Sequence, residues 1–217
     1  MIRIAPSILS ADFLHLERDV EFVNRHADLF HLDVMDGSFV PNLSFGFPVV
    51  EAIAGKARKP LDTHLMIVHP DRYVERFVRA GSSMLSFHLE AAEQDGEDPA
   101  QILRHIRSCG ARAGLAINPD IPVERLYPFT GDADYFLIMS VFAGFGGQKF
   151  IEDSVGRVAA LRRELDRRGA HHDIEVDGGV SAANAAVLAE AGATILVAGS
   201  SVFKAADPSS AVAAMRG

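Results

Sequence analysis

The 217-residue sequence predicts a single (β/α)8 barrel over residues 1–217. Short apolar or β-branched runs alternate with longer segments of helical spacing, and eight such units can be counted. Strict alternation of strand and helix implies parallel strands. No low-complexity tract or linker divides the chain. Because barrels of this kind begin at roughly 200 residues, we expect one compact domain with short loops.

The eight runs that we interpret as strands are 4–9, 29–34, 61–66, 84–89, 112–117, 135–141, 174–177 and 194–198. Asp12 is a candidate N-cap for a helix that continues to about Arg25. The apolar stripe of that helix would consist of Phe13, Leu16, Val20 and Val23. A further helix is expected to begin near Pro70 and to end at Gly81. Other amphipathic stretches are 155–168, 182–191 and the closing segment 208–216.

Composition limits the classes of partner. Apolar residues make up 48% and charged residues 23%, as in soluble globular proteins. The net charge of −8 argues against nucleic acid or an anionic membrane as the main partner. One cysteine, Cys109, rules out an intrachain disulfide and suits a reducing cytoplasm. No apolar run approaches the roughly 18 residues of a membrane span, and the first residues lack the pattern of a signal peptide.

Polar side chains that could bind a metal close three of the predicted strands. In this fold the active site lies at the carboxyl ends of the strands. His31 and Asp33 end the second run, His64 ends the third and Asp177 ends the seventh. Two imidazoles and two carboxylates can hold one divalent cation per chain, such as Fe(II), Zn(II), Mn(II) or Co(II), and leave positions open for a substrate.

Two further polar residues lie near these strand ends. Glu175 shares the strand face of Asp177, so we expect an inward-facing acid deeper in the barrel, with a partner that the sequence does not identify. His88 closes the fourth run, where it either lines the pocket or packs as a buried polar residue.

Glycine clusters follow strands six, seven and eight. They are Gly144-Phe145-Gly146-Gly147, Gly178-Gly179 and Gly199-Ser200. Glycine lets backbone N–H groups approach an anion closely, and barrels often bind phosphate after strands seven and eight. A tight turn would explain any one cluster alone, but three at adjacent strand ends favour a phosphate cradle made mostly of backbone.

Together these segments resemble ribulose-phosphate 3-epimerases over nearly the whole chain and in the same order. The matching motifs are IAPSILSADF (4–13), DVMDGSFVPN (33–42), HLM (64–66), GFGGQ (144–148), EVDGG (175–179) and AGS (198–200). The resemblance implies a barrel with a ribulose-phosphate-binding type of phosphate site. It also implies a small-molecule ketose phosphate as substrate, a place in the pentose phosphate pathway and a homo-oligomer, either a dimer or a hexamer.

The resemblance also assigns roles to residues. Asp33 and Asp177 match the two acid–base aspartates, which are metal ligands together with His31 and His64. Ser7 and His64 match substrate contacts. The phosphate-side contacts are matched by Gly144, Phe145, Gly146, Gly147, Gly178, Gly179, Gly199 and Ser200. A thioether collar around the substrate is matched by Met35, Met66 and Met139, for which core filling is the alternative interpretation.

Two opposed carboxylates suit an epimerisation. Inversion at C3 of a 2-ketose needs a proton to leave from one face and return on the other, which a single base on one face cannot accomplish. A cation would stabilise the charge that develops on the substrate oxygens. The alternatives are an epimerase for a related ketose phosphate such as allulose 6-phosphate, a decarboxylase or aldolase on the same barrel, and a non-catalytic sugar-phosphate binder. A Schiff-base aldolase needs a lysine at a strand end, and none of the four lysines closes a predicted strand.

One pair departs from the family pattern. Phe142-Ala143 stands where the family has Asn-Pro before the Gly-Phe-Gly-Gly-Gln motif. Alanine leaves φ free, so closing the loop should cost more, by about 0.4–1 kcal/mol. Phe142 could pin the loop by packing or could reshape the pocket for another ketose phosphate.

Overall fold

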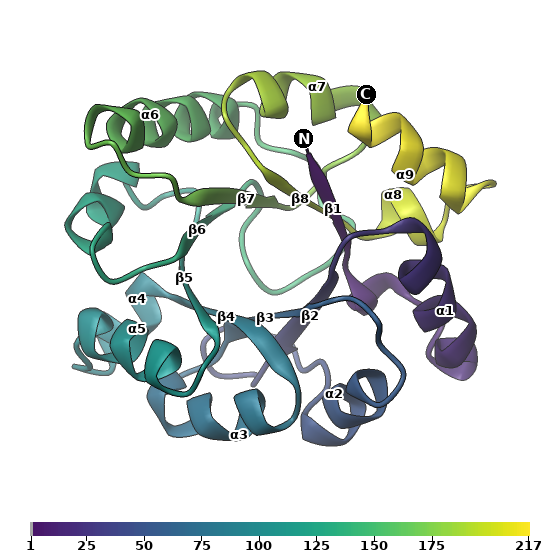
Figure 1. Cartoon of the computed structure of the whole chain (residues 1–217), viewed down its shortest axis with the longest axis horizontal. Coiled ribbons are helices and arrows are strands. Elements are labelled where there is room, and N and C mark those ends of the chain that lie inside the picture. Colours follow the sequence, from purple (N-terminus) through teal and green to yellow (C-terminus); the bar gives the residue numbers. More distant parts are fainter. Residues whose placement is uncertain (1) are drawn as a thin grey trace.

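Eight parallel strands form the inner wall of the molecule, and helices cover its outside (Figure 1). The computed structural model describes residues 2–217. The strands are β1 (Arg3–Pro6), β2 (Phe30–Met35), β3 (Leu61–Met66), β4 (Ser82–His88), β5 (Arg112–Ile117), β6 (Tyr135–Met139), β7 (Asp173–Asp177) and β8 (Ile195–Ala198). They pair in the order β1-β8-β7-β6-β5-β4-β3-β2, which confirms the predicted fold class.

The ring closes between β1 and β2 at the level of the candidate site. Ser7 directly follows β1 and forms a parallel bridge with His31 of β2. Further along the same seam, the N–H of Asp28 donates to the carbonyl of Ile4 at 3.0 Å. The closure therefore fixes Ser7 beside a predicted metal ligand.

The outer layer contains both α-helices and 3-10 helices. The α-helices are α1 (Leu16–His26), α2 (Phe47–Ala54), α3 (Val74–Arg79), α4 (Leu89–Gln94), α5 (Pro99–Ser108), α6 (Asp153–Arg167), α7 (Ala182–Glu190), α8 (Ser200–Phe203) and α9 (Pro208–Arg216). The 3-10 helices are η1 (Ile8–Ser10), η2 (Phe13–His15), η3 (Pro70–Tyr73) and η4 (Val123–Phe129). Between β5 and β6 the helical segment is η4 alone, where Pro128 lacks the N–H that a regular helix would use.

The expected first helix is only partly correct. Asp12 does act as an N-cap, since its carboxylate accepts a hydrogen bond from the N–H of Leu14 at 3.1 Å. The turn that follows is the 3-10 helix η2, and α1 begins at Leu16. The change of helix type turns Phe13 away from the stripe, and its side chain is 48% exposed. Val20 and Val23 are buried as expected.

A smaller core fills the inside of the barrel below the site. Its apolar members are Ala5, Leu29, Met84, Tyr135, Ile195 and Val197. The ring of Tyr135 lies over Gly114, where an added Cβ would come within 2.2 Å of the tyrosine Cζ. Only glycine at position 114 leaves room for this ring, which then reaches the carboxylate of Asp62 with its hydroxyl group at 3.0 Å.

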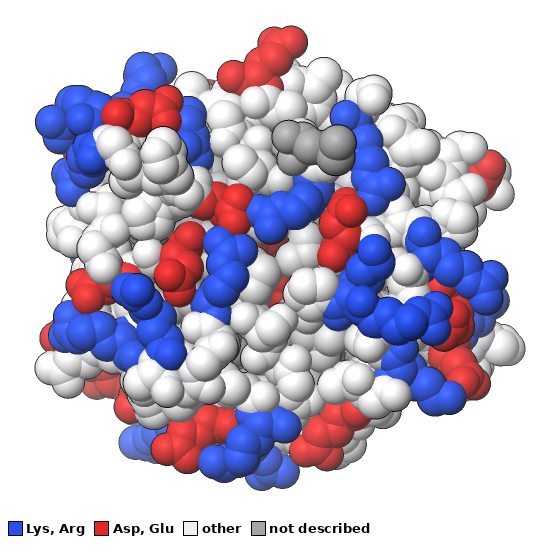
Figure 2. All heavy atoms as spheres, in the orientation of Figure 1, with Lys and Arg blue, Asp and Glu red and all other residues white. Residues whose placement is uncertain are grey.

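Acidic and basic side chains lie beside one another over most of the face in Figure 2, in place of the one-sided basic patch that nucleic acid selects. Among residues 2–217, no helix has both the length and the apolar character to cross a membrane.

Candidate metal and acid–base site

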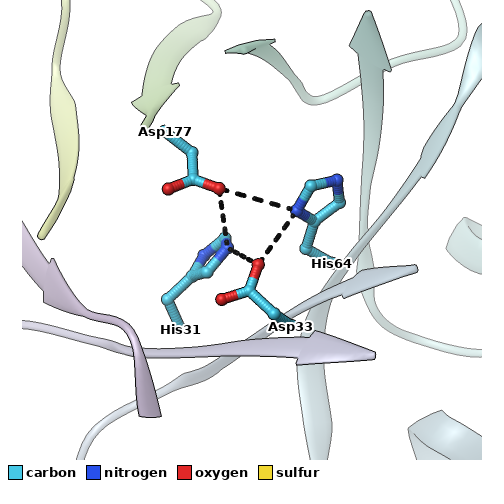
Figure 3. A group of neighbouring side chains, drawn as sticks. All are labelled: His31, Asp33, His64 and Asp177. Carbon is cyan, nitrogen blue, oxygen red and sulfur yellow. Dashed lines mark ion pairs between the residues drawn. The ribbon is translucent and has the colours of Figure 1, made fainter. Parts of the chain in front are cut away.

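Four side chains converge at the mouth of the barrel. His31 and Asp33 come from β2 and His64 comes from β3, while Asp177 faces them from the end of β7 (Figure 3). His31 Nε2 and His64 Nδ1 each lie 3.3 Å from Asp33 Oδ1. The same two nitrogens lie 4.0 and 3.9 Å from Asp177 Oδ2. The structure thus brings together all four residues that the sequence proposed as metal ligands.

The donor atoms of this cluster fit a divalent cation. His31 Nε2, Asp33 Oδ1 and His64 Nδ1 are buried and have no hydrogen-bond partner. Buried polar atoms are rarely left unpaired because the loss of water is costly. Ligands held at about 2.0–2.2 Å by a tetrahedral ion lie roughly 3.3–3.6 Å from one another, close to the separations seen here. The cluster can therefore hold one cation such as Zn(II) or Fe(II).

The surroundings shift the pKa values of Asp33 and Asp177 in opposite directions. Burial would raise the pKa of Asp33, but the nearby imidazoles of His31 and His64 lower it well below its usual range. Burial and repulsion from Asp33 raise the pKa of Asp177 to about 7. Carboxylates whose pKa values are separated in this way can divide the roles of base and acid.

The electrostatics around His31 also favour a cation. Burial alone would lower the pKa of His31, but the carboxylates of Asp33 and Asp62 raise it well above its usual range. His31 Nδ1 lies 2.6 Å from Asp62 Oδ2, which holds the ring with Nε2 turned toward the cluster. A metal-binding histidine commonly has such a carboxylate behind it.

Glu175 lies close to His31 and Asp62 in the interior of the barrel. Its Oε1 lies 3.4 Å from His31 Nδ1. Burial, together with the charge of Asp62, raises the pKa of Glu175 well above its usual range, so the neutral acid is favoured. The expectation of an inward-facing acid is confirmed, since Glu175 is fully buried. Its neighbours are His31 and Asp62, and within residues 2–217 neither of its carboxyl oxygens has a hydrogen-bond partner. The sequence signal for Asp62 was its position two residues before His64, on the same strand face.

His88 lies behind His64 and does not line the cavity. The two Nε2 atoms are 2.9 Å apart, and His88 Nδ1 lies 3.0 Å from Glu90 Oε1. The second of the two alternatives for His88, a buried polar residue, is therefore the one observed. Sequence reasoning missed Glu90 altogether, because it stands in a helix and reaches the site only through other side chains.

A cavity lies next to the cluster, and the remaining residues that the sequence predicted for the site line it. Its lining includes Ser7, Asp33, Met35, Met66, Met139, Gly144, Phe145, Gly146, Gly147, Asp177, Gly178, Gly179, Gly199 and Ser200. Ser7 Oγ donates to Asp33 Oδ2 at 2.5 Å. His31 and His64 are fully buried and are not part of the lining, so the substrate contact expected for His64 stays a prediction.

The glycines in this lining differ in how far the fold alone explains them. Gly178 and Gly179 have φ of 118° and 63°, and an added Cβ would lie 2.4 Å from Val141 and 2.6 Å from Phe150. At Gly199 an added Cβ would lie 2.6 Å from Ser10 Oγ. Gly146 has neither constraint, since its Cβ would make only ordinary contacts of 3.7 Å. The fold therefore does not require glycine at position 146.

The pair Phe142-Ala143, which departs from the family pattern, makes a hydrogen bond that a proline at position 143 could not make. The N–H of Ala143 donates to Asn118 Oδ1 at 2.9 Å. This bond offsets the expected entropic cost, since one hydrogen bond contributes about 0.5–1.5 kcal/mol. The ring of Phe142 is 52% exposed and does not line the cavity, so neither of the effects considered for it is seen.

Fold and site together define a (β/α)8-barrel protein with a His/Asp cluster that could hold a divalent metal beside a glycine-lined cavity. A family model described as "Ribulose-phosphate 3 epimerase family" matches residues 3–203 of the chain. The chain belongs to the ribulose-phosphate 3-epimerase family.

Named relatives agree with this membership. The chain is 44% identical to a ribulose-phosphate 3-epimerase of Mycobacterium tuberculosis, over 98% of this chain and 91% of the relative. It is 43% identical to that of Bacillus subtilis, over 100% and 99% of the two chains. Among solved structures, a 3-hexulose-6-phosphate synthase superposes with a TM-score of 0.70, at 16% identity and over 99% and 97% of the two chains. This likeness concerns the fold alone.

Proposed function

We propose that the chain is a metal-dependent epimerase that interconverts D-ribulose 5-phosphate and D-xylulose 5-phosphate by proton transfer at C3. The observation that carries the proposal is the position of Asp33 and Asp177. They extend from β2 and β7, strands that do not neighbour each other in the ring, and meet at one cation site. Family membership agrees with this activity.

The two carboxylates can act in turn on the two faces of C3. Asp33, favoured as the ionised form, accepts the C3 proton from one face, while Asp177, whose raised pKa makes its protonated form accessible, returns a proton on the other face. Ser7 holds one oxygen of Asp33 by its hydrogen bond, so the other oxygen stays directed at the cluster. When bound, the cation supplies positive charge for the developing enediolate. The reverse reaction exchanges the roles of the two aspartates.

The phosphate group would lie in the glycine-lined part of the cavity. None of its lining residues within 2–217 is Lys or Arg, although the chain carries a net charge of −8. Local attraction for an anion must then come from backbone N–H groups, and the glycines allow those groups to approach closely. The remote phosphate binding would help to hold C3 between the two carboxylates.

Replacement of Gly146 tests the cradle. Gly146→Val is expected to raise KM for ribulose 5-phosphate by roughly tenfold or more, the size of one lost hydrogen bond to a charged group. Steady-state kinetics with ribulose 5-phosphate and with unphosphorylated ribulose measure it, and ribulose itself should be a very poor substrate. Gly131→Val is the matched control, because a Cβ there meets open space away from the cavity. Equal kcat/KM for the two sugars would refute a phosphate cradle.

The substrate itself is tested by a comparison of two ketose phosphates. We expect kcat/KM for ribulose 5-phosphate to exceed that for allulose 6-phosphate by at least roughly tenfold, or about 1.4 kcal/mol of transition-state binding. The reason is that Phe142 does not line the cavity, and Ala143, which does, adds only a methyl group there. A coupled assay on the purified protein gives both constants. A ratio near one or below would assign the chain to the other substrate, and no turnover of either would favour a sugar-phosphate binder.

Assembly and location complete the proposal. We expect a homo-oligomer, either a dimer or a hexamer, in the cytoplasm. Large apolar side chains are exposed at Leu14 (90%), Leu43 (72%) and Phe13 (48%), and the ring of Phe13 lies 5.8 Å from that of Phe45. An apolar group of this kind on the outer surface supports burial against a second copy.

A further inference from the structure

We propose that Glu90 and Asn118 are positioning residues that couple the loop at 142–148 to the metal ligand His64. The loop forms one side of the cavity, whereas His64 is buried behind it. A continuous chain of hydrogen bonds connects them, from the backbone of Ala143 through Asn118, Glu90 and His88. The inference rests on the proposed metal site.

The direction of each bond in this chain can be worked out. His64 Nδ1 faces the cluster and must be unprotonated to bind a cation, so its proton lies on Nε2 and is donated to His88 Nε2. The proton of His88 then lies on Nδ1 and is donated to Glu90 Oε1. With Glu90 ionised, a single anionic acceptor therefore fixes the tautomers of both rings and keeps the lone pair of His64 toward the metal.

The same oxygen of Glu90 holds the loop. Asn118 donates to Glu90 Oε1 from its backbone N–H at 2.9 Å and from its side chain at 2.7 Å. This orientation leaves Asn118 Oδ1 free to accept the N–H of Ala143 at 2.9 Å. Rotation of the amide would break both side-chain bonds together. Movement of the loop at Ala143 therefore acts on the carboxylate that orients His64.

Arg157 makes the connection rigid. Its guanidinium is partly buried and donates to the carbonyl groups of Asn118 at 2.8 Å and of Met139 at 2.9 Å. Asn118 directly follows β5 and Met139 is the last residue of β6, so Arg157 ties together the ends of two neighbouring strands. Asn118 consequently has little freedom to adjust when a neighbour is lost, and a change at one end passes to the other.

A purely structural clamp and a coupling device predict different results. If the hydrogen bonds only stabilise the fold, their removal should lower the thermal stability and change nothing else. Coupling is reciprocal, so a change on the loop side must also change the affinity for the metal. Metal affinity, measured in the absence of any substrate, therefore separates the two.

The test compares three variants of the full chain. Zn(II) affinity is measured by competition with a chelator, thermal unfolding is recorded, and deuterium exchange is followed in residues 142–148. Glu90→Gln keeps the shape and removes the charge, and should weaken Zn(II) binding by roughly tenfold or more, as for other outer partners of metal ligands. Asn118→Ala contacts neither the ion nor an imidazole, and should weaken Zn(II) binding by at least about threefold while speeding exchange in the loop.

Asn42→Ala is the matched control. Asn42 donates to the carbonyl of Gly144 at 2.8 Å and so anchors the same loop from another side, without a bond to Glu90. It should speed exchange in the loop and leave the Zn(II) constant unchanged. If Asn118→Ala does not fold, Ala143→Pro replaces it, because proline removes the N–H that is donated to Asn118 and also fixes φ at this position, while the side chain of Asn118 stays in place.

The possible outcomes are distinct. Zn(II) constants within twofold of the wild type in both Glu90→Gln and Asn118→Ala would overturn the coupling. Equal weakening in Asn42→Ala would also overturn it, since any loosening of the loop would then have the same effect. A wild-type chain that binds no Zn(II), Fe(II), Mn(II) or Co(II) would instead reject the proposed metal-dependent function.

Discussion

Asp33→Asn and Asp177→Asn are each expected to lower epimerase turnover by at least roughly 10²–10⁴-fold, the usual contribution of a general acid or base. Each aspartate would act on one face of C3, so the other cannot replace it. Steady-state kinetics in both directions measure the loss. Metal content must be determined for each variant, because both residues also contribute oxygens to the proposed cation site.

Proton exchange with solvent distinguishes the two bases more directly. In heavy water, a variant with one remaining base should incorporate deuterium at C3 of one epimer without producing the other. The epimer that exchanges identifies the face on which the remaining aspartate acts. If either variant inverts the sugar at the wild-type rate, that aspartate is not a base, and the two-face mechanism is wrong.

Removal of the metal is expected to abolish turnover, and one divalent cation per chain should restore it. Three buried donor atoms lack any other partner, and the enediolate charge needs a positive centre at this position. Dialysis against a chelator followed by separate addition of Fe(II), Zn(II), Mn(II) and Co(II) tests the requirement. Elemental analysis of protein prepared without added metal identifies the native ion. Full activity in a preparation verified as metal-free would contradict the proposal.

The sequence predicted the barrel and the convergence of its site because both follow from local patterns. The runs 61–66 and 112–117 coincide with β3 and β5 in full. His31 and Asp33 are two residues apart, which fixes a common strand face, and the fold rule places strand ends at one mouth. Register then brings Asp33 beside His64.

Other features could not be read from the sequence because they depend on tertiary contacts. Phe13 had the spacing of a helix stripe, but a 3-10 turn changed its direction. Asn118 looked only like the end of a strand, and its importance comes from Glu90, which is 28 residues away in the chain. No local pattern of apolar or polar residues encodes such a pairing.

The packing of Tyr135 against Gly114 has a consequence for how this chain can change over generations. A methyl group at position 114 would collide with the hydroxyl-bearing end of the buried Tyr135 ring, at a cost of about 1–3 kcal/mol for overpacking. Loss of the tyrosine hydroxyl would in turn leave Asp62 Oδ1 without that donor, while Oδ2 of the same carboxylate holds His31 Nδ1. A change at Gly114 or at Tyr135 is therefore costly while the other residue stays as it is. We therefore expect position 114 to stay glycine in any variant that keeps Tyr135, because the two positions pack as a pair.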